Sequence, residues 1–115
     1  MGTDFFENWT VQVRKGILEL CVLSALRGRR LYGYDLVKTL RALDGLVISE
    51  GTIYPILSRF KQEGLVETSL VESPAGPARK YYRLTARGER QLDAMQAYWQ
   101  AIRGGVQTLS EEPRP

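Results

Sequence analysis

Histidine is absent from this 115-residue chain, and cysteine occurs once, at Cys21. A chain with one thiol and no imidazole cannot form an intrachain disulfide, a zinc-finger site or a Cys-His nucleophile. Cys21 stands inside an apolar run, where a free thiol behaves as a small buried hydrophobe. The sequence shows neither a clustered acidic motif for a metal nor a convergent acid–base pair. We therefore expect no metal, no cofactor and no enzymatic activity.

Long hydrophobic runs are missing as well. The longest candidate, residues 17–26, is interrupted by Glu19 and Ser24, and it is shorter than the roughly 18 residues that a membrane span needs. The N-terminus lacks the basic and then apolar layout of a signal peptide. We expect a cytoplasmic protein with no membrane partner, and the chain length suits one domain.

The net charge of +3 is small, so the distribution of the bases is more informative than their total. Two segments are rich in bases and contain one acid each, Asp35 in the first and Glu89 in the second. Such segments are either solvated faces or a footprint for phosphates, which requires local charge density rather than a large total. The bases are Arg27, Arg29, Arg30, Lys38 and Arg41, and then Arg79, Lys80, Arg83, Arg87 and Arg90.

The first half of the chain has the periodicity of helices. Apolar residues are dense before Gly28, which suits the end of a helix that is buried on more than one side. A narrow apolar stripe follows Gly33, and Ser49 is a suitable N-cap for the next helix. The pattern predicts a loose arm at residues 1–8 and helices at about 9–26, 34–43 and 50–63.

The pattern then changes to the two-residue period of strands. Alternation over residues 66–71 and an aromatic-rich segment at 80–84 predict a β-hairpin. Residues 73–78 contain two prolines and a glycine, which predicts a connecting loop too long for a two-residue turn.

A last helix is expected from residue 86, with Thr85 as its cap. Its apolar residues alternate steps of three and four, which is the heptad pattern of helices that pair. Gly104 and Gly105 weaken its end by about 1 kcal/mol each relative to alanine. Residues 85–110 therefore form a candidate dimerisation helix, and 111–115 a disordered tail. The apolar seam consists of Leu92, Met95, Trp99, Ile102, Val106 and Leu109.

Three helices, a hairpin and a long helix are the order of a winged helix-turn-helix domain, here residues 1–84. The fold class is α+β and mostly α. The third helix would enter the major groove of DNA, and the hairpin would be the wing. The third helix begins with EGTIYPILSRF. The helical period predicts a buried face with Ile53, Ile56, Leu57 and Phe60, and an outward face with Thr52, Pro55, Arg59 and Gln62. Gly51 and Pro55 either allow a close approach to DNA or simply shape the helix start.

Three segments also carry a family resemblance. LYGYDLVKTL, EGTIYPILSRFKQEGLVE and GPARKYYRLTARG, in this order, resemble the PadR family of bacterial transcriptional regulators. The likeness covers residues 17–92. The single helix after the wing resembles the short subgroup of that family.

The resemblance implies a homodimer that binds an inverted-repeat operator on double-stranded DNA and usually represses. It also implies dimerisation through the last helix together with the first, in agreement with the heptad seam. Some small members bind a planar aromatic effector between the subunits, stacked on a tryptophan of the last helix. Trp99 occupies the matching place, and Trp9 is a second candidate near the same interface.

The resulting DNA-facing set comes from the third helix, the mouth of the second, the wing and the first helix. It consists of Thr52, Tyr54, Pro55, Ser58, Arg59, Tyr32, Arg79, Lys80, Arg14 and Lys15. Arg83 alternates with apolar residues on its strand and is expected to face solvent. An alternative function is a winged-helix protein-interaction module without DNA binding. The polar outward face of the third helix and the basic wing favour DNA.

Overall fold

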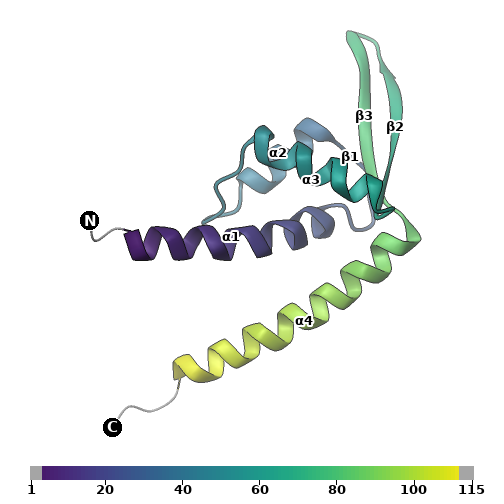
Figure 1. Cartoon of the computed structure of the whole chain (residues 1–115). Coiled ribbons are helices and arrows are strands. Elements are labelled where there is room, and N and C mark those ends of the chain that lie inside the picture. The colour runs from purple at the N-terminus through teal and green to yellow at the C-terminus, as the bar shows by residue number, and fades with distance from the viewer. Residues whose placement is uncertain (1–3, 112–115) are drawn as a thin grey trace.

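The computed structural model describes residues 4–111, and its elements confirm a mostly helical winged helix-turn-helix fold (Figure 1). The three strands form one antiparallel sheet in the order β1-β3-β2. None of the helices in this range is both long and apolar enough to cross a membrane. The elements are α1 (Asp4–Ala25), β1 (Leu31–Tyr32), α2 (Gly33–Arg41), α3 (Glu50–Gln62), β2 (Val66–Ser73), β3 (Gly76–Leu84) and α4 (Ala86–Glu111).

A single apolar core lies between the second half of α1, α2, α3 and the base of the sheet. Leu23, Leu36, Leu57 and Phe60 are fully or almost fully buried in it. Burying a side chain of this size is worth about 1.5–3 kcal/mol relative to leaving it in water. Ile56, the fourth residue of the predicted buried face of α3, is half-buried and packs against the same core. Because one face of α3 is packed against the core, the opposite face of this helix points outward.

The start of α4 is fixed to the connection between α3 and the hairpin. As predicted, Thr85 caps the helix: its hydroxyl accepts a hydrogen bond from the Gly88 amide at 3.0 Å and donates one to the Gly64 carbonyl at 2.6 Å. A Cβ atom at Gly88 would lie 2.0 Å from the Leu65 carbonyl oxygen, so only glycine allows this crossing. Leu92, one turn further on, is buried in the core. These contacts set the direction in which α4 leaves the domain.

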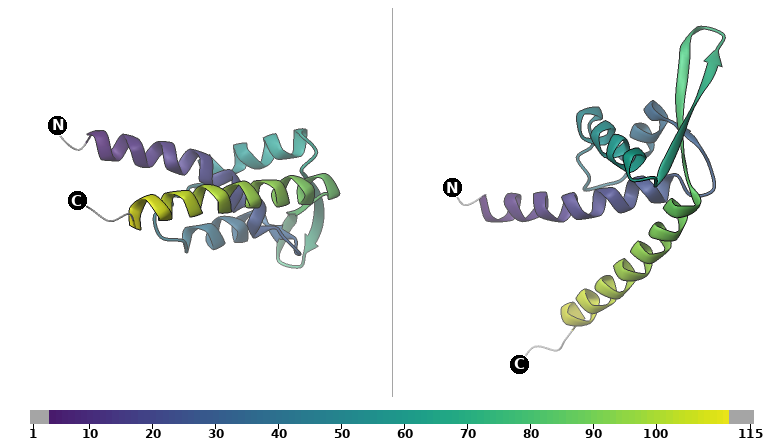
Figure 2. Two further views of the ribbon diagram at one scale, coloured as in Figure 1. Left: turned by 90° about the horizontal axis from the view of Figure 1, so that it is seen from below. Right: turned by 45° about the vertical axis from the view of Figure 1, so that its right-hand side comes forward.

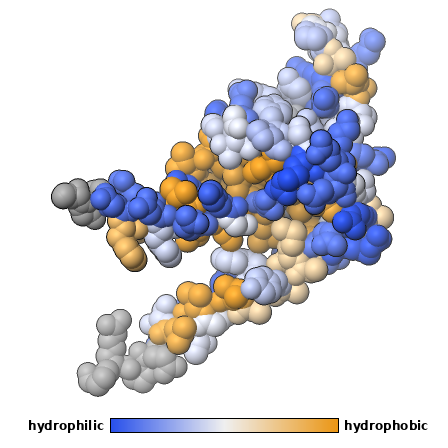
Figure 3. All heavy atoms as spheres, viewed as in Figure 1, coloured by the Kyte–Doolittle hydropathy of each residue, from blue (hydrophilic) through white to orange (hydrophobic). Residues whose placement is uncertain are grey.

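The helices α1 and α4 diverge from this anchored end (Figures 1 and 2). The Arg27–Asp93 ion pair, at 2.8 Å, and the hydrogen bond from Gln96 to Ser24, at 2.9 Å, join them near the C-terminus of α1. Their free ends carry large exposed apolar side chains, and Figure 3 shows hydrophobic surface on both. These side chains include Phe5, Phe6 and Trp9 on α1 and Ile102, Val106 and Leu109 on α4.

Several expected boundaries were wrong. The arm at residues 1–8 is helical from Asp4, whose carboxylate, with that of Glu7, suits the first turn of a helix. Gly104 and Gly105 do not interrupt α4, which continues to Glu111. The predicted tail beyond that residue lies outside the described range.

The wing loop was also predicted wrongly. Ser73 pairs with Gly76, so the turn contains only two residues, and a register shift between Val71 and Ser73 absorbs one extra residue of β3. Pro77 is tolerated within β3 because β1 pairs only with Tyr81 and Tyr82, which leaves the outer half of β3 as an edge. Arg79 and Lys80 therefore both lie within β3.

We expect Gly88→Ala to destabilise the protein by about 1–3 kcal/mol, the usual cost of overpacking, because the added methyl group meets a backbone carbonyl. Gly104→Ala is the control: it adds the same group to the same helix in open space, where alanine is favoured by roughly 0.5–1 kcal/mol. Thermal unfolding should therefore show a lower Tm for the first variant and an equal or higher Tm for the second. Equal Tm values for the two variants would contradict the proposed crossing constraint.

Candidate nucleic-acid interface

The outward face of α3 is made of small and polar groups. At 3.6 residues per turn, Gly51, Pro55, Ser58 and Gln62 lie opposite the buried side of the helix, and all four are exposed. Pro55 lacks the amide that would bond the carbonyl of Gly51, so this edge of the helix keeps a carbonyl without its usual partner. The face has no bulky side chain that would hold another surface at a distance.

Tyr54 occupies the flank of α3 that faces α2. A Cβ atom at Gly33 would lie 2.8 Å from its hydroxyl oxygen, so the ring packs against the start of α2. Burial, the Glu50 carboxylate and Tyr32 all raise the pKa of the Tyr54 hydroxyl, which therefore stays protonated near neutral pH and can donate a hydrogen bond. Burial and then Tyr54 likewise raise the pKa of Tyr82. Tyr54 thus has a packing role, whatever its hydroxyl contacts.

Arg59 and Thr52 occupy the opposite flank. The Arg59 guanidinium forms ion pairs with Glu19 of α1 and, at 3.5 Å, with Glu63. The Thr52 hydroxyl is 3.0 Å from the Ser49 hydroxyl at the helix start. Two of the predicted DNA contacts are therefore already engaged within the subunit, and Arg59 is directed toward α1.

The two predicted bases of the wing face opposite sides of β3. Lys80 shares a face with the buried Tyr82 and Leu84, so it lies on the side of α3. Arg79 lies on the outer side, with its guanidinium 4.9 Å from the ring centre of Tyr32. Lys61, at the end of α3, lines the same space as Lys80. Sequence reasoning missed Lys61, although its position three residues after the outward Ser58 was an available signal.

An aromatic and basic cluster covers the outer side of the sheet. The rings of Tyr32 and Tyr81 face each other across β1 and β3 at 5.9 Å. The guanidinium of Arg30 stacks over Tyr81 at 4.7 Å, as that of Arg79 does over Tyr32. Stacking holds a guanidinium plane in place while its N–H groups can still bond phosphate oxygens. Arg30 belongs to the first basic segment of the sequence but was not included in the predicted DNA-facing set.

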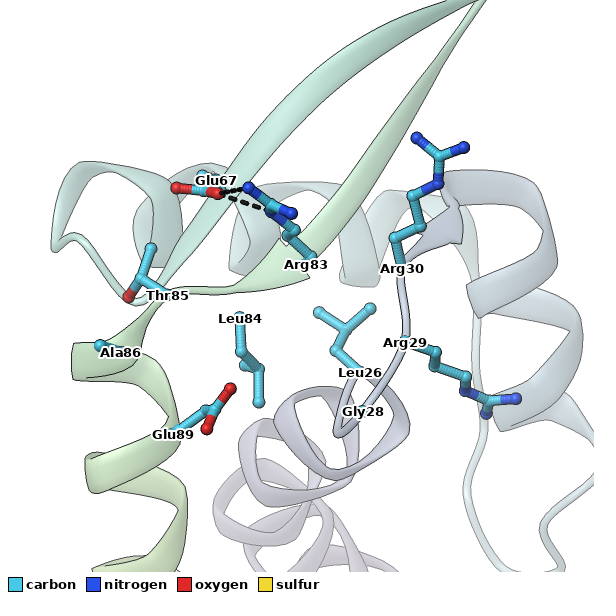
Figure 4. A pocket seen from close by; sticks show the side chains of 10 residues that line it. All are labelled: Leu26, Gly28, Arg29, Arg30, Glu67, Arg83, Leu84, Thr85, Ala86 and Glu89. Atoms are coloured by element: carbon cyan, nitrogen blue, oxygen red, sulfur yellow. Dashed lines mark hydrogen bonds and ion pairs between the residues drawn. The ribbon is translucent and has the colours of Figure 1, made fainter.

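A different cavity, of about 510 Å³, lies between the end of α1, the base of the wing and the start of α4 (Figure 4). Its lining has three arginines and two glutamates, so most of its charge is compensated. Arg83 forms an ion pair with Glu67 at 2.5 Å, and Arg29 donates to the Ala25 carbonyl at 2.8 Å. Glu89 adds a further negative charge to the lining. We assign no anion to this cavity, and Arg83 is exposed beside its partner, as the alternation predicted.

An apolar groove of about 530 Å³ separates α1 from α4. Trp99 is half-buried in its lining, together with Met95 and Ile102 of the predicted seam. Trp9 is 56% exposed near Phe6 and is not among the lining residues, so one subunit does not bring the two tryptophans together. The lining is completed by Val13, Gly16, Ile17, Leu20, Ala94 and Tyr98.

The remaining predicted residues are placed as follows. Arg14 is half-buried and Lys15 is exposed, and both lie on α1. Leu92 is fully buried within its own subunit, so its predicted role in dimerisation was wrong. The apolar stripe of α4 begins in the core of the subunit and continues from there into the rest of the heptad seam. Among residues 4–111, no three potential metal-ligating side chains come together.

Comparison with known proteins agrees with this arrangement. Residues 22–94 match the family described as "Transcriptional regulator PadR-like family". A PadR family transcriptional regulator from Eggerthella lenta is 35% identical, covers 96% of each chain and superposes with a TM-score of 0.81. The chain belongs to the PadR-like family. Its members are transcriptional regulators and not enzymes, and their partner is DNA.

Two further crystal structures support the assignment. A PadR-like regulator from Bacillus cereus is 37% identical, with coverage of 89% of this chain and 99% of the other and a TM-score of 0.81. A PadR family regulator from Clostridium difficile is 27% identical, with coverage of 79% and 95% and a TM-score of 0.72. The long α4 after the wing therefore belongs to a fold that other bacterial regulators share along most of their length.

We expect Glu19→Gln to raise duplex affinity at low salt, because it would release the guanidinium of Arg59, a predicted DNA contact, from its ion pair. An exposed ion pair is worth up to about 1 kcal/mol, which corresponds to a gain of at most roughly fivefold. Glu7→Gln makes the same charge change on the same helix and is the control. The measurement is fluorescence anisotropy with a labelled duplex.

The double variant Glu19→Gln/Arg59→Ala should bind duplex DNA no more tightly than Arg59→Ala alone, because no guanidinium remains to be released. A gain that persists in the double variant would show that Glu19 acts through general charge repulsion rather than through Arg59.

Proposed function

We propose that this chain is a homodimeric regulator, acting as a repressor in the cytoplasm, that binds an inverted-repeat operator through α3 and the wing. The main observation in support is the outward face of α3, where four small or polar residues lie beside the bases Lys61 and Lys80. Small polar groups suit contact with base edges and phosphates, whereas a protein-docking face would be expected to have a bulky apolar anchor. The family membership supports a DNA partner.

Dimerisation is proposed from the free ends of α1 and α4. Val106 and Leu109 are 57% and 76% exposed, and Phe5 on α1 is 84% exposed. Large exposed apolar side chains gathered on a protein surface are typical of an interface. A two-fold dimer would present two α3 helices to two half-sites of a symmetric operator. The contacting part of the predicted seam is then Met95, Trp99, Ile102 and Val106.

The groove between α1 and α4 is the proposed effector site. Its volume is within the range of about 300–1,000 Å³ typical of small-molecule sites, and its lining is apolar. The half-buried Trp99 offers a ring on which a planar aromatic compound can stack. Trp9 of the partner subunit is the proposed second aromatic side chain, since one subunit does not bring its own Trp9 to the groove. Binding there would release the operator.

The dimeric protein should protect two symmetric half-sites in footprinting of the DNA upstream of its own gene. Val106→Asp should dissociate the dimer and weaken binding by at least tenfold, because a carboxylate cannot be buried unpaired at the seam. Thr108→Asp places the same charge two residues further along α4, on the side of the helix away from the seam, and should leave both properties intact. Sedimentation and anisotropy report the two properties. A monomeric wild type that ignores duplex DNA would refute the proposal.

Planar aromatic compounds should quench the fluorescence of Trp99. The variant Trp9→Phe leaves Trp99 as the only tryptophan, so its emission can be titrated alone. We expect saturable quenching and a parallel loss of operator binding. The variant Trp99→Phe, in which Trp9 is the only tryptophan, is the control and should show a weaker response. A flat emission from Trp99 across a broad panel of compounds would indicate that it only packs against the partner.

A further inference from the structure

A cavity of about 440 Å³ opens between α3 and the wing. Ser58, Lys61 and Gln62 line it from α3, and Thr68 and Lys80 line it from the strands. Its apolar part consists of the core residues Leu57 and Tyr82. Apart from the phenol of Tyr82, the polar part of the lining has two ammonium groups, two aliphatic hydroxyl groups and one amide, which come from three separate elements.

The positive charge of this cavity is not compensated. No acidic side chain is among its lining residues, and within residues 4–111 neither Lys61 nor Lys80 forms an ion pair. By contrast, Arg59 and Arg83 are each held by a carboxylate. The strand register explains the separation, because Thr68 and Lys80 lie on the α3 side of the hairpin, while Glu67 pairs with Arg83 on the other side.

We propose that this cavity is a phosphate clamp for one strand of duplex DNA. The inference rests on the proposed function, and it further takes α3 to enter the major groove and the wing to reach the adjacent minor groove. A single sugar–phosphate strand separates two neighbouring grooves, so a protein that reaches into both must straddle that strand. The cavity lies between the two elements that do so. Lysine ammonium and serine or threonine hydroxyl groups are suitable donors to phosphate oxygens.

The clamp contributes affinity and register but no base discrimination, because phosphates are the same in every sequence. Replacing either lysine should therefore weaken binding by a similar factor on all duplexes. Each lost phosphate contact should also reduce the slope of log affinity against log salt concentration by about 0.9. Arg103→Ala, which removes one positive charge from the exposed far half of α4, is the charge-matched control.

The first experiment compares the wild type with Lys61→Ala, Lys80→Ala and Arg103→Ala in salt titrations followed by fluorescence anisotropy. The probes are a duplex selected by the wild type from a random-sequence library and the same duplex with altered base pairs. We expect both lysine variants to lose slope and to keep the preference between the two probes. Unchanged slopes, or a lost preference, would overturn the clamp. Sizing and thermal unfolding check that each variant remains folded and dimeric.

The second experiment locates the clamped phosphate. Single phosphates of the selected duplex are replaced by uncharged methylphosphonates, and each duplex is titrated with every variant. The position that weakens the wild type but not Lys61→Ala should be the same as, or next to, the position found with Lys80→Ala. Separate positions would overturn the shared clamp. A wild type that binds no duplex would instead refute the proposed function, so the two failures are distinguishable.

Discussion

The crossing of α4 over the Leu65 carbonyl group is the constraint on which the rest of the structure depends. Gly88 removes the side chain that would block the approach, and Thr85 bonds both the new helix and the end of the preceding segment. Because this contact lies where α3 ends and the wing begins, it fixes the direction of α4 relative to both. The position of the groove against α1, and the separation of two α3 helices in a symmetric dimer, follow from that direction.

Local chemistry made much of the fold predictable from the sequence. The period of Ile53, Leu57 and Phe60, and the cap at Thr85, identified α3 and the start of α4 to within a residue. Failures occurred where tertiary contacts decide. The two-residue strand β1 has no periodic signal of its own, because it exists only through pairing with Tyr81 and Tyr82. The prolines near the wing turn suggested a loop, whereas an unpaired strand edge accommodates one of them.

The outward and buried faces of α3 could be predicted from the sequence, but the ion pairs of the candidate site could not. Helical period alone separated the outward residues of α3 from the buried ones. It could not show that Arg59 bends toward Glu19, 40 positions earlier in the chain, or that Lys61 shares a cavity with Lys80. Long flexible bases take the nearest uncompensated carboxylate, and the fold decides which carboxylate is near. The bases left without one are therefore better candidates for phosphate contacts than the bases that sequence position favours.

The helix α1 borders both proposed binding regions through consecutive residues. Leu20 lines the groove against α4, and Glu19, on the neighbouring side of the same turn, holds Arg59 of α3. A helix moves nearly as a rigid body because its backbone hydrogen bonds link successive turns. A molecule that displaced α1 at Leu20 would therefore also move the counterion of Arg59. The ligand would shift the DNA-binding equilibrium only as far as it binds the two positions of α1 with different affinity.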